Sequence, residues 1–118
     1  MPAAATPAVG GIAMMFGRWY PLAGAGTGVP EEPGLFQLRV PKGLISFPRG
    51  KSAMIHYGAS DNIQNSIADL AAQWGDRDWL CRHTVELLNS ERADLDAALA
   101  SLLSRFEHRF GARPSMPE

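Results

Sequence analysis

Two stretches decide the fold, "PGLFQLRV" at residues 33–40 and "AMIHYGASDNIQNSIADL" at residues 53–70. In the first stretch Phe36, Leu38 and Val40 lie on one face and alternate with a more mixed set of side chains. A period of two is typical of a half-buried strand. The second stretch begins as another strand and passes through a glycine into a helix. The two stretches together predict a strand, a second strand and a helix.

The helix that follows Gly58 has a clear beginning, face and end. Ser60 or Asp61 can accept hydrogen bonds from its first free amides, and Gly75 closes it. Between these positions one apolar stripe repeats at helical spacing, formed by Ile63, Ile67, Leu70, Ala71 and Trp74. Such a stripe indicates a helix that packs one side on a sheet.

The rest of the chain adds one strand and one helix. In "WLCRHTVEL" at residues 79–87, apolar side chains alternate again, which predicts a third strand. "NSERADLDAALASLLSRFEHRFG" at residues 89–111 predicts a long helix capped by Ser90. We therefore expect a small α/β structure with a three-stranded sheet flanked by helices and preceded by an irregular N-terminal arm.

Composition divides the chain into an arm, a domain and a tail. Residues 1–33 are rich in Ala, Gly and Pro and predict a flexible or partner-packed arm. Residues 34–113 form the single expected α/β domain, and residues 114–118 form a short tail.

The arm contains one cluster of aromatic side chains, Phe16, Trp19 and Tyr20. Three aromatic rings so close together are costly to leave in water, so we expect them to be buried. They pack either on the core of their own domain or on another protein, which makes them candidate interaction residues.

The loop between the first two strands is basic. It carries Arg39, Lys42, Arg49 and Lys51 with no acidic residue between them. One interpretation is a solvated loop that protects a sheet edge from sticking to neighbours. The other is a weak, salt-sensitive contact to phosphate groups.

Composition limits the classes of function. The chain has 118 residues, 46% hydrophobic content and a net charge of −1, which gives no overall attraction to nucleic acid or an anionic membrane. Cys81 is the single cysteine and is expected in the core, which is compatible with a reducing compartment. No apolar run is long enough for a membrane span and no basic leader precedes one, so we expect a soluble, cytoplasmic protein.

The two quoted stretches resemble the GIY-YIG family over roughly residues 30–113. Gly34, Leu35 and Phe36 stand where the first signature triplet would, and "HYG" at residues 56–58 stands where the second would. The resemblance implies the fold of a metal-dependent nuclease. It also implies two tyrosines that prepare water, an arginine on the first helix that stabilises the phosphate, and a glutamate on a later helix that binds the metal.

This chain departs from each of those four positions. Phe36 has no hydroxyl, His56 replaces the second tyrosine, and Ser66 stands at the arginine position. Asp96 best matches the metal glutamate and would hold Mg²⁺ or Mn²⁺ if the chain were a nuclease. A phosphodiester needs an activated nucleophile, a cation and usually a metal ion, and most of these groups are missing.

We therefore expect a non-catalytic GIY-YIG-like interaction module, an accessory subunit of a larger assembly, with a protein partner and no cofactor. The alternative is a nucleic-acid-binding protein or a divergent metal-dependent nuclease that uses the basic loop with His56 and Asp96. The three histidines lack the close spacing of a local metal motif, so no zinc site is expected.

Overall fold

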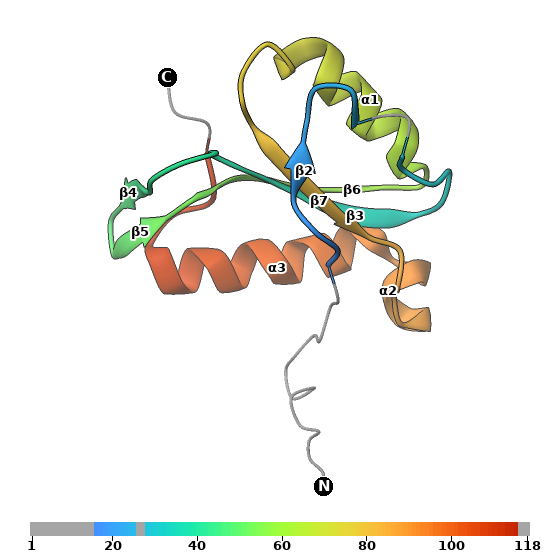
Figure 1. Cartoon of the computed structure of the whole chain (residues 1–118). Helices are drawn as coiled ribbons and strands as arrows, with labels where there is room; N and C mark the ends of the chain where they lie inside the picture. Colours follow the sequence, from blue (N-terminus) through green and yellow to red (C-terminus); the bar gives the residue numbers. More distant parts are fainter. Residues whose placement is uncertain (1–15, 26–27, 116–118) are drawn as a thin grey trace, which may run out of the picture.

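The computed structural model describes residues 16–25 and 28–115. Its elements in chain order are β2 (Tyr20–Pro21), β3 (Gly34–Arg39), β4 (Ile45–Phe47), β5 (Gly50–Ser52), β6 (Met54–Ser60), α1 (Ile63–Trp74), β7 (Leu80–Thr84), α2 (Asn89–Ala93) and α3 (Leu95–Phe110) (Figure 1). The prediction of a small α/β fold is confirmed.

The main sheet has four antiparallel strands in the order β2-β7-β3-β6, so the expectation of three strands is wrong by one. The added strand comes from the segment expected to be an arm. Its backbone follows the open edge of β7, with the Gly17 N–H donating to the His83 carbonyl at 3.0 Å and the Leu22 N–H donating to the Trp79 carbonyl at 2.9 Å. Backbone pairing along an edge needs no apolar alternation, which is why the sequence pattern did not reveal it.

The described part of residues 1–33 also enters the core. Leu22 is fully buried and Val29 is 3% exposed. The Val29 carbonyl accepts a hydrogen bond from the Gln64 side chain at 3.0 Å, which ties this segment to α1. Residues 20–25 and 28–33 are therefore packed on the domain, while residues 1–15 of the expected arm lie outside the described residues.

The loop between β3 and β6 forms the small hairpin β4-β5, separate from the main sheet. Phe47 of this hairpin packs against two rings of α3, with its ring centroid 5.2 Å from that of Phe106 and 5.9 Å from that of Phe110. The expected elaborated loop is thus a hairpin folded onto the last helix.

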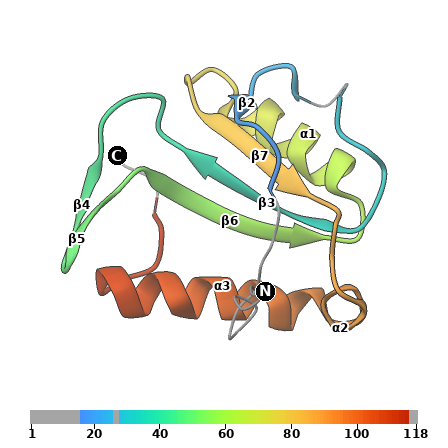
Figure 2. The ribbon, with the colours of Figure 1, turned by 60° about the horizontal axis from the view of Figure 1, so that its bottom comes forward.

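The two long helices lie on opposite faces of the main sheet, as the two views in Figures 1 and 2 show. On the α1 face, Phe36 and Leu38 belong to one buried cluster with Ile63 and Ile67. On the α3 face, Phe106 is buried and packs edge-on against Tyr57 of β6 at 5.7 Å. Successive strand residues point to opposite faces, so β3 and β6 serve both cores.

Two helix boundaries differ from the predicted ones. The first helix is capped by Asn62, whose side chain accepts the Asn65 N–H at 3.2 Å, rather than by Ser60 or Asp61. The long helix expected from residue 89 is interrupted at Asp94, whose side chain accepts the Ala97 N–H at 3.0 Å. An Asp side chain that bonds the backbone in this way competes with helix continuation and starts a new helix. Within the described residues, no helix is both long and apolar enough to cross a membrane.

Gly34 stands at the start of β3, close to the backbone of Thr84 in β7. A Cβ at Gly34 would overlap the backbone carbonyl oxygen of Thr84, and it would also press on Ile63 at 3.2 Å. We predict that Gly34→Ala lowers the free energy of unfolding by about 1–3 kcal/mol, because a strand backbone cannot yield as a flexible side chain can.

The matched control for Gly34→Ala is Gly28→Ala, because a Cβ at Gly28 has no atom within 4 Å. Urea unfolding of both variants and the parent chain measures the difference. Equal losses in the two variants would contradict the close approach of β3 and β7.

Candidate functional site

Phe36 and His56, the two positions at which the sequence resemblance would imply tyrosines, lie together on the α1 face of the sheet. The ring centroids of Phe36 and His56 are 6.0 Å apart, and the His56 ring meets Trp74 of α1 edge-on at 5.9 Å. Phe36 is only 5% exposed. The three rings form a packed row between the sheet and α1, which we call the ring row.

Gly58 explains how Phe36 fits. The Phe36 ring lies so close over Gly58 that a Cβ there would overlap the ring's Cζ atom. Phe36 and Gly58 also face each other as partners across β3 and β6. The glycine of the second triplet therefore makes room for the phenyl ring, and both residues serve packing.

His56 is a neutral side chain in this environment. Burial lowers the pKa of His56 below its ordinary 6.5, because the surroundings disfavour a charged imidazolium. A neutral imidazole can accept a proton, but His56 faces two aromatic rings rather than an open cleft. Its position suits packing better than proton transfer.

Ser66 has a structural contact. Its hydroxyl donates to the Ser60 Oγ at 2.7 Å, and Ser60 in turn accepts the Asn62 N–H at 3.0 Å. These bonds join the end of β6 to the first turn of α1. The side chain at the family's arginine position is therefore used to fix the helix.

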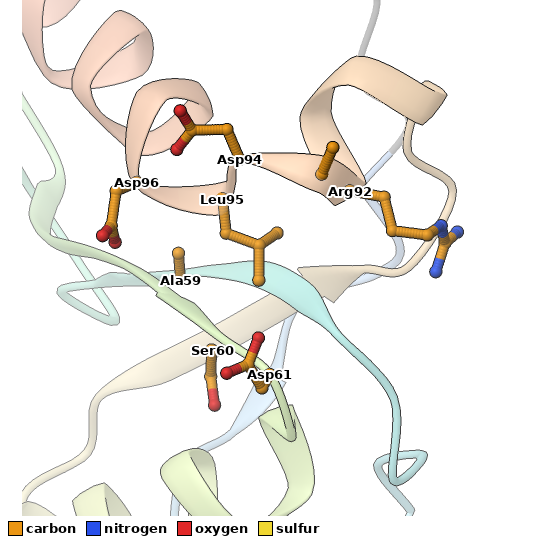
Figure 3. Close-up of a pocket in the computed structure, with 8 residues that line it drawn as sticks. Ala59, Ser60, Asp61, Arg92, Asp94, Leu95 and Asp96 are labelled. Carbon is orange, nitrogen blue, oxygen red and sulfur yellow. The ribbon is translucent and has the colours of Figure 1, made fainter.

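Asp96 does not join these residues. It lies in the first turn of α3, the helix on the sheet face opposite α1 (Figure 2). Asp96 is exposed and lines a polar cavity of about 280 Å³ together with Ala59, Ser60, Asp61, Arg92, Ala93, Asp94 and Leu95 (Figure 3). The four positions implied by the resemblance are thus divided between the two faces.

The cavity beside Asp96 is acidic but not arranged as a metal site. The single arginine in its lining, Arg92, extends away to donate to the Val85 carbonyl at 2.9 Å (Figure 3). In the described part of the chain, no three His, Cys, Asp or Glu side chains are grouped closely enough to hold a metal ion.

The four basic residues of the loop are not one patch. Arg49 donates to the His108 carbonyl at 2.6 Å and to the Glu107 carbonyl at 3.3 Å, so it caps the C-terminal end of α3. Lys42 and Lys51 are exposed on the loop. Arg39 instead lies over the Trp19 ring, 5.4 Å from its centroid.

Tyr20 of the aromatic cluster belongs to the α1 face of the sheet. The Cys81 thiol donates to the Tyr20 oxygen at 3.5 Å, and the Tyr20 hydroxyl and His83 Nδ1 share a hydrogen bond of 2.6 Å. Burial raises the pKa of Cys81 to about 11, so the thiol stays protonated and unreactive. Tyr20 therefore fastens β2 to β7.

Phe16 and Trp19 lie around an arginine that the sequence did not single out. The Arg82 guanidinium lies 4.4 Å from the Trp19 ring centroid and 4.9 Å from that of Phe16. Its Nε donates to Gln37 Oε1 at 2.7 Å, and Gln37 is only 4% exposed. The signal that could have revealed this cluster is a polar residue in the middle of each of two apolar strands, β3 and β7.

No family model, curated protein or solved structure matches this chain. Any function assigned to this chain therefore has to be inferred from the geometry of the described residues.

The half-buried side chain of His56 generates a pH prediction. The pKa of His56 is lowered by burial, so the unfolded chain takes up a proton at a higher pH than the folded protein does. The contribution of neutral His56 to the free energy of unfolding is therefore fully present above pH 6.5. It is lost as the pH falls from 6.5 through the pKa that His56 has in the folded protein. Burial lowers the pKa of His83 as well, which adds a second contribution of the same sign.

We predict that His56→Leu flattens this loss of stability, while His108→Gln, at an exposed position on α3, leaves it unchanged. Urea unfolding at a series of pH values between mildly acidic and neutral measures it. An identical pH dependence in His56→Leu and the parent chain would contradict the burial of His56.

Proposed function

We propose that this chain is a non-catalytic interaction domain with a GIY-YIG-like arrangement, and that it serves as an accessory subunit of a larger protein assembly. The observation that carries the proposal is the ring row of Phe36, His56 and Trp74. At the place where the family resemblance implies a reactive pair, these side chains pack as part of a core.

The chemistry of phosphodiester cleavage supports the same conclusion. Phe36 offers no hydroxyl, and the Ser66 hydroxyl is bonded to Ser60 and carries no positive charge. Asp96 belongs to α3, on the sheet face opposite the Phe36 ring, and its cavity is also lined by Ser60. Groups that act on one phosphate must converge within a few ångströms of it, whereas Phe36 packs on the α1 face and Asp96 belongs to α3.

The α3 face supports a binding role. Phe16, Trp19, Arg39 and Arg82 are all partly exposed there, and aromatic residues and arginine are enriched at the centres of protein interfaces. A small domain with a packed catalytic position and such a surface is suited to holding a partner.

The first test of the proposal is a cleavage assay. Purified full chain is incubated with single- and double-stranded DNA and RNA in the presence of Mg²⁺ or Mn²⁺, beside Asp96→Ala and His56→Leu. We predict intact substrate with all three proteins. Cleavage by the parent chain that disappears in Asp96→Ala would replace the proposal with a divergent metal-dependent nuclease.

The second test is recovery of a complex. Tagged full chain is isolated from its own cells after nuclease treatment and washing in high salt. We predict a protein partner in stoichiometric amount, equally retained by the double variant Lys42→Gln with Lys51→Gln, which removes two exposed cations of the loop. Loss of all bound material on nuclease treatment would favour nucleic-acid binding.

A further inference from the structure

Two guanidinium groups share one aromatic ring on the α3 face of the sheet. The Trp19 centroid lies 4.4 Å from the Arg82 guanidinium carbon and 5.4 Å from that of Arg39. Arg82 also contacts the Phe16 ring and is held in place by Gln37. We call Phe16, Trp19, Gln37, Arg39 and Arg82 the arginine-aromatic cluster.

The positive charge of this cluster is not balanced within the described residues. Among the described residues, the salt bridge joins Arg113 and Glu107, and it includes neither Arg39 nor Arg82. The neighbours of Arg82 are the neutral Gln37 and two aromatic rings. Burial lowers the pKa of Arg82, Tyr57 raises it and Arg39 lowers it, so the two cations are close enough to repel each other.

Both arginines keep donors for an outside acceptor. The hydrogen bonds that they make within the described residues use Nε, from Arg82 to Gln37 and from Arg39 to the Val40 carbonyl at 3.1 Å. A guanidinium has about five N–H donors, so the Nη groups are left for an external partner. The aromatic rings and Gln37 fix the orientation of the two guanidinium groups before a ligand arrives.

We propose that the arginine-aromatic cluster binds a carboxylate group on an acidic segment of a partner protein. The inference rests on the proposed function as an interaction domain and names the chemistry of its partner. A carboxylate matches a guanidinium because two parallel N–H···O bonds can form between the planar groups. It would also relieve the repulsion between Arg39 and Arg82.

The geometry favours an acidic protein segment over nucleic acid. A platform for bases needs free aromatic faces, whereas the Trp19 ring already contacts two guanidinium groups and the Phe16 ring contacts one. The chain also has a net charge of −1, which provides no field to draw in a polyanion.

The neighbouring part of the chain cannot supply the acid. Residues 1–15, which directly precede the cluster, contain neither Asp nor Glu. The segment directly before the cluster therefore offers it no carboxylate, and we assign the acid to a segment of another protein.

The test uses a synthetic peptide of alternating Glu and Gly and a matched peptide with Gln in place of Glu. Binding to the full chain is followed by calorimetry and by the indole N–H signal of Trp19 in NMR spectra. We expect the Glu peptide to bind and the Gln peptide not to bind. Arg82→Gln and Arg39→Gln should each weaken binding about tenfold or more, because each variant loses at least one charge-assisted hydrogen bond to the carboxylate.

Two further variants separate binding from folding. Arg82→Lys keeps the charge but loses the planar fork, and it should also weaken binding. Arg105→Gln removes an exposed arginine of α3 outside the cluster and should leave binding unchanged. Thermal unfolding of each variant shows that the fold is retained.

Several outcomes would overturn the inference. These are equal binding of the Glu and Gln peptides, no binding of the Glu peptide at millimolar concentration, or tighter binding of single-stranded DNA or inorganic phosphate. If the cellular complex survives in the double variant Arg39→Gln with Arg82→Gln, the partner docks elsewhere and the proposed function stands without this inference. If no complex forms and substrate is cleaved, the proposed function itself fails.

Discussion

Pairing of β3 on both of its edges is the constraint on which the rest of the structure depends. β6 lies on one side of β3 and β7 on the other, both antiparallel, and the register with β6 shifts between Leu38 and Arg39. The register places Phe36 and Leu38 toward α1 and Leu35 and Gln37 toward the opposite face, because strand side chains alternate. A slip by one residue would exchange the two faces, burying Gln37 in the α1 core and moving Phe36 to the face of α3. The close approach at Gly34 helps to fix this register.

From this register the two faces take different roles. On the α1 face, the Phe36 ring covers Gly58 and packs beside His56, so the positions that resemble a nuclease site contribute to the core. On the α3 face, the helix contacts mainly β6 and the β4-β5 hairpin, while the surface over β7 carries Arg82 with Phe16 and Trp19. Aromatic rings therefore pack on both faces, while the two guanidinium groups of Arg39 and Arg82 gather with Phe16 and Trp19 on the α3 face.

Much of the local structure could be predicted from residue patterns. Apolar alternation located β3 and β7, the glycine that precedes α1 marked the end of the strand β6, and the helical stripe from Ile63 to Trp74 matches α1. The errors occurred where backbone hydrogen bonds decide the structure. The fourth strand, β2, follows the edge of β7 through main-chain bonds that no side-chain period records, and Asp94 divides the last helix by capping Ala97. Of the candidate site, the nearness of Phe36 and His56 follows from strand pairing, whereas the meeting of Trp19 with Arg82 does not.

By itself, the sequence determined which residue types stand at each position. It determined that Phe36 has no hydroxyl, that residues 60–74 carry no cation, and that the strands and helices alternate as they do. Only the tertiary structure decided which of these residues meet. It placed Asp96 on α3 and the ring row on the α1 face, turned Arg49 to the end of α3, and brought Trp19 into contact with both Arg39 and Arg82. The physical reason is that side-chain chemistry is local to each residue, while contacts between residues distant in the chain depend on strand register and on which face of the sheet each helix covers.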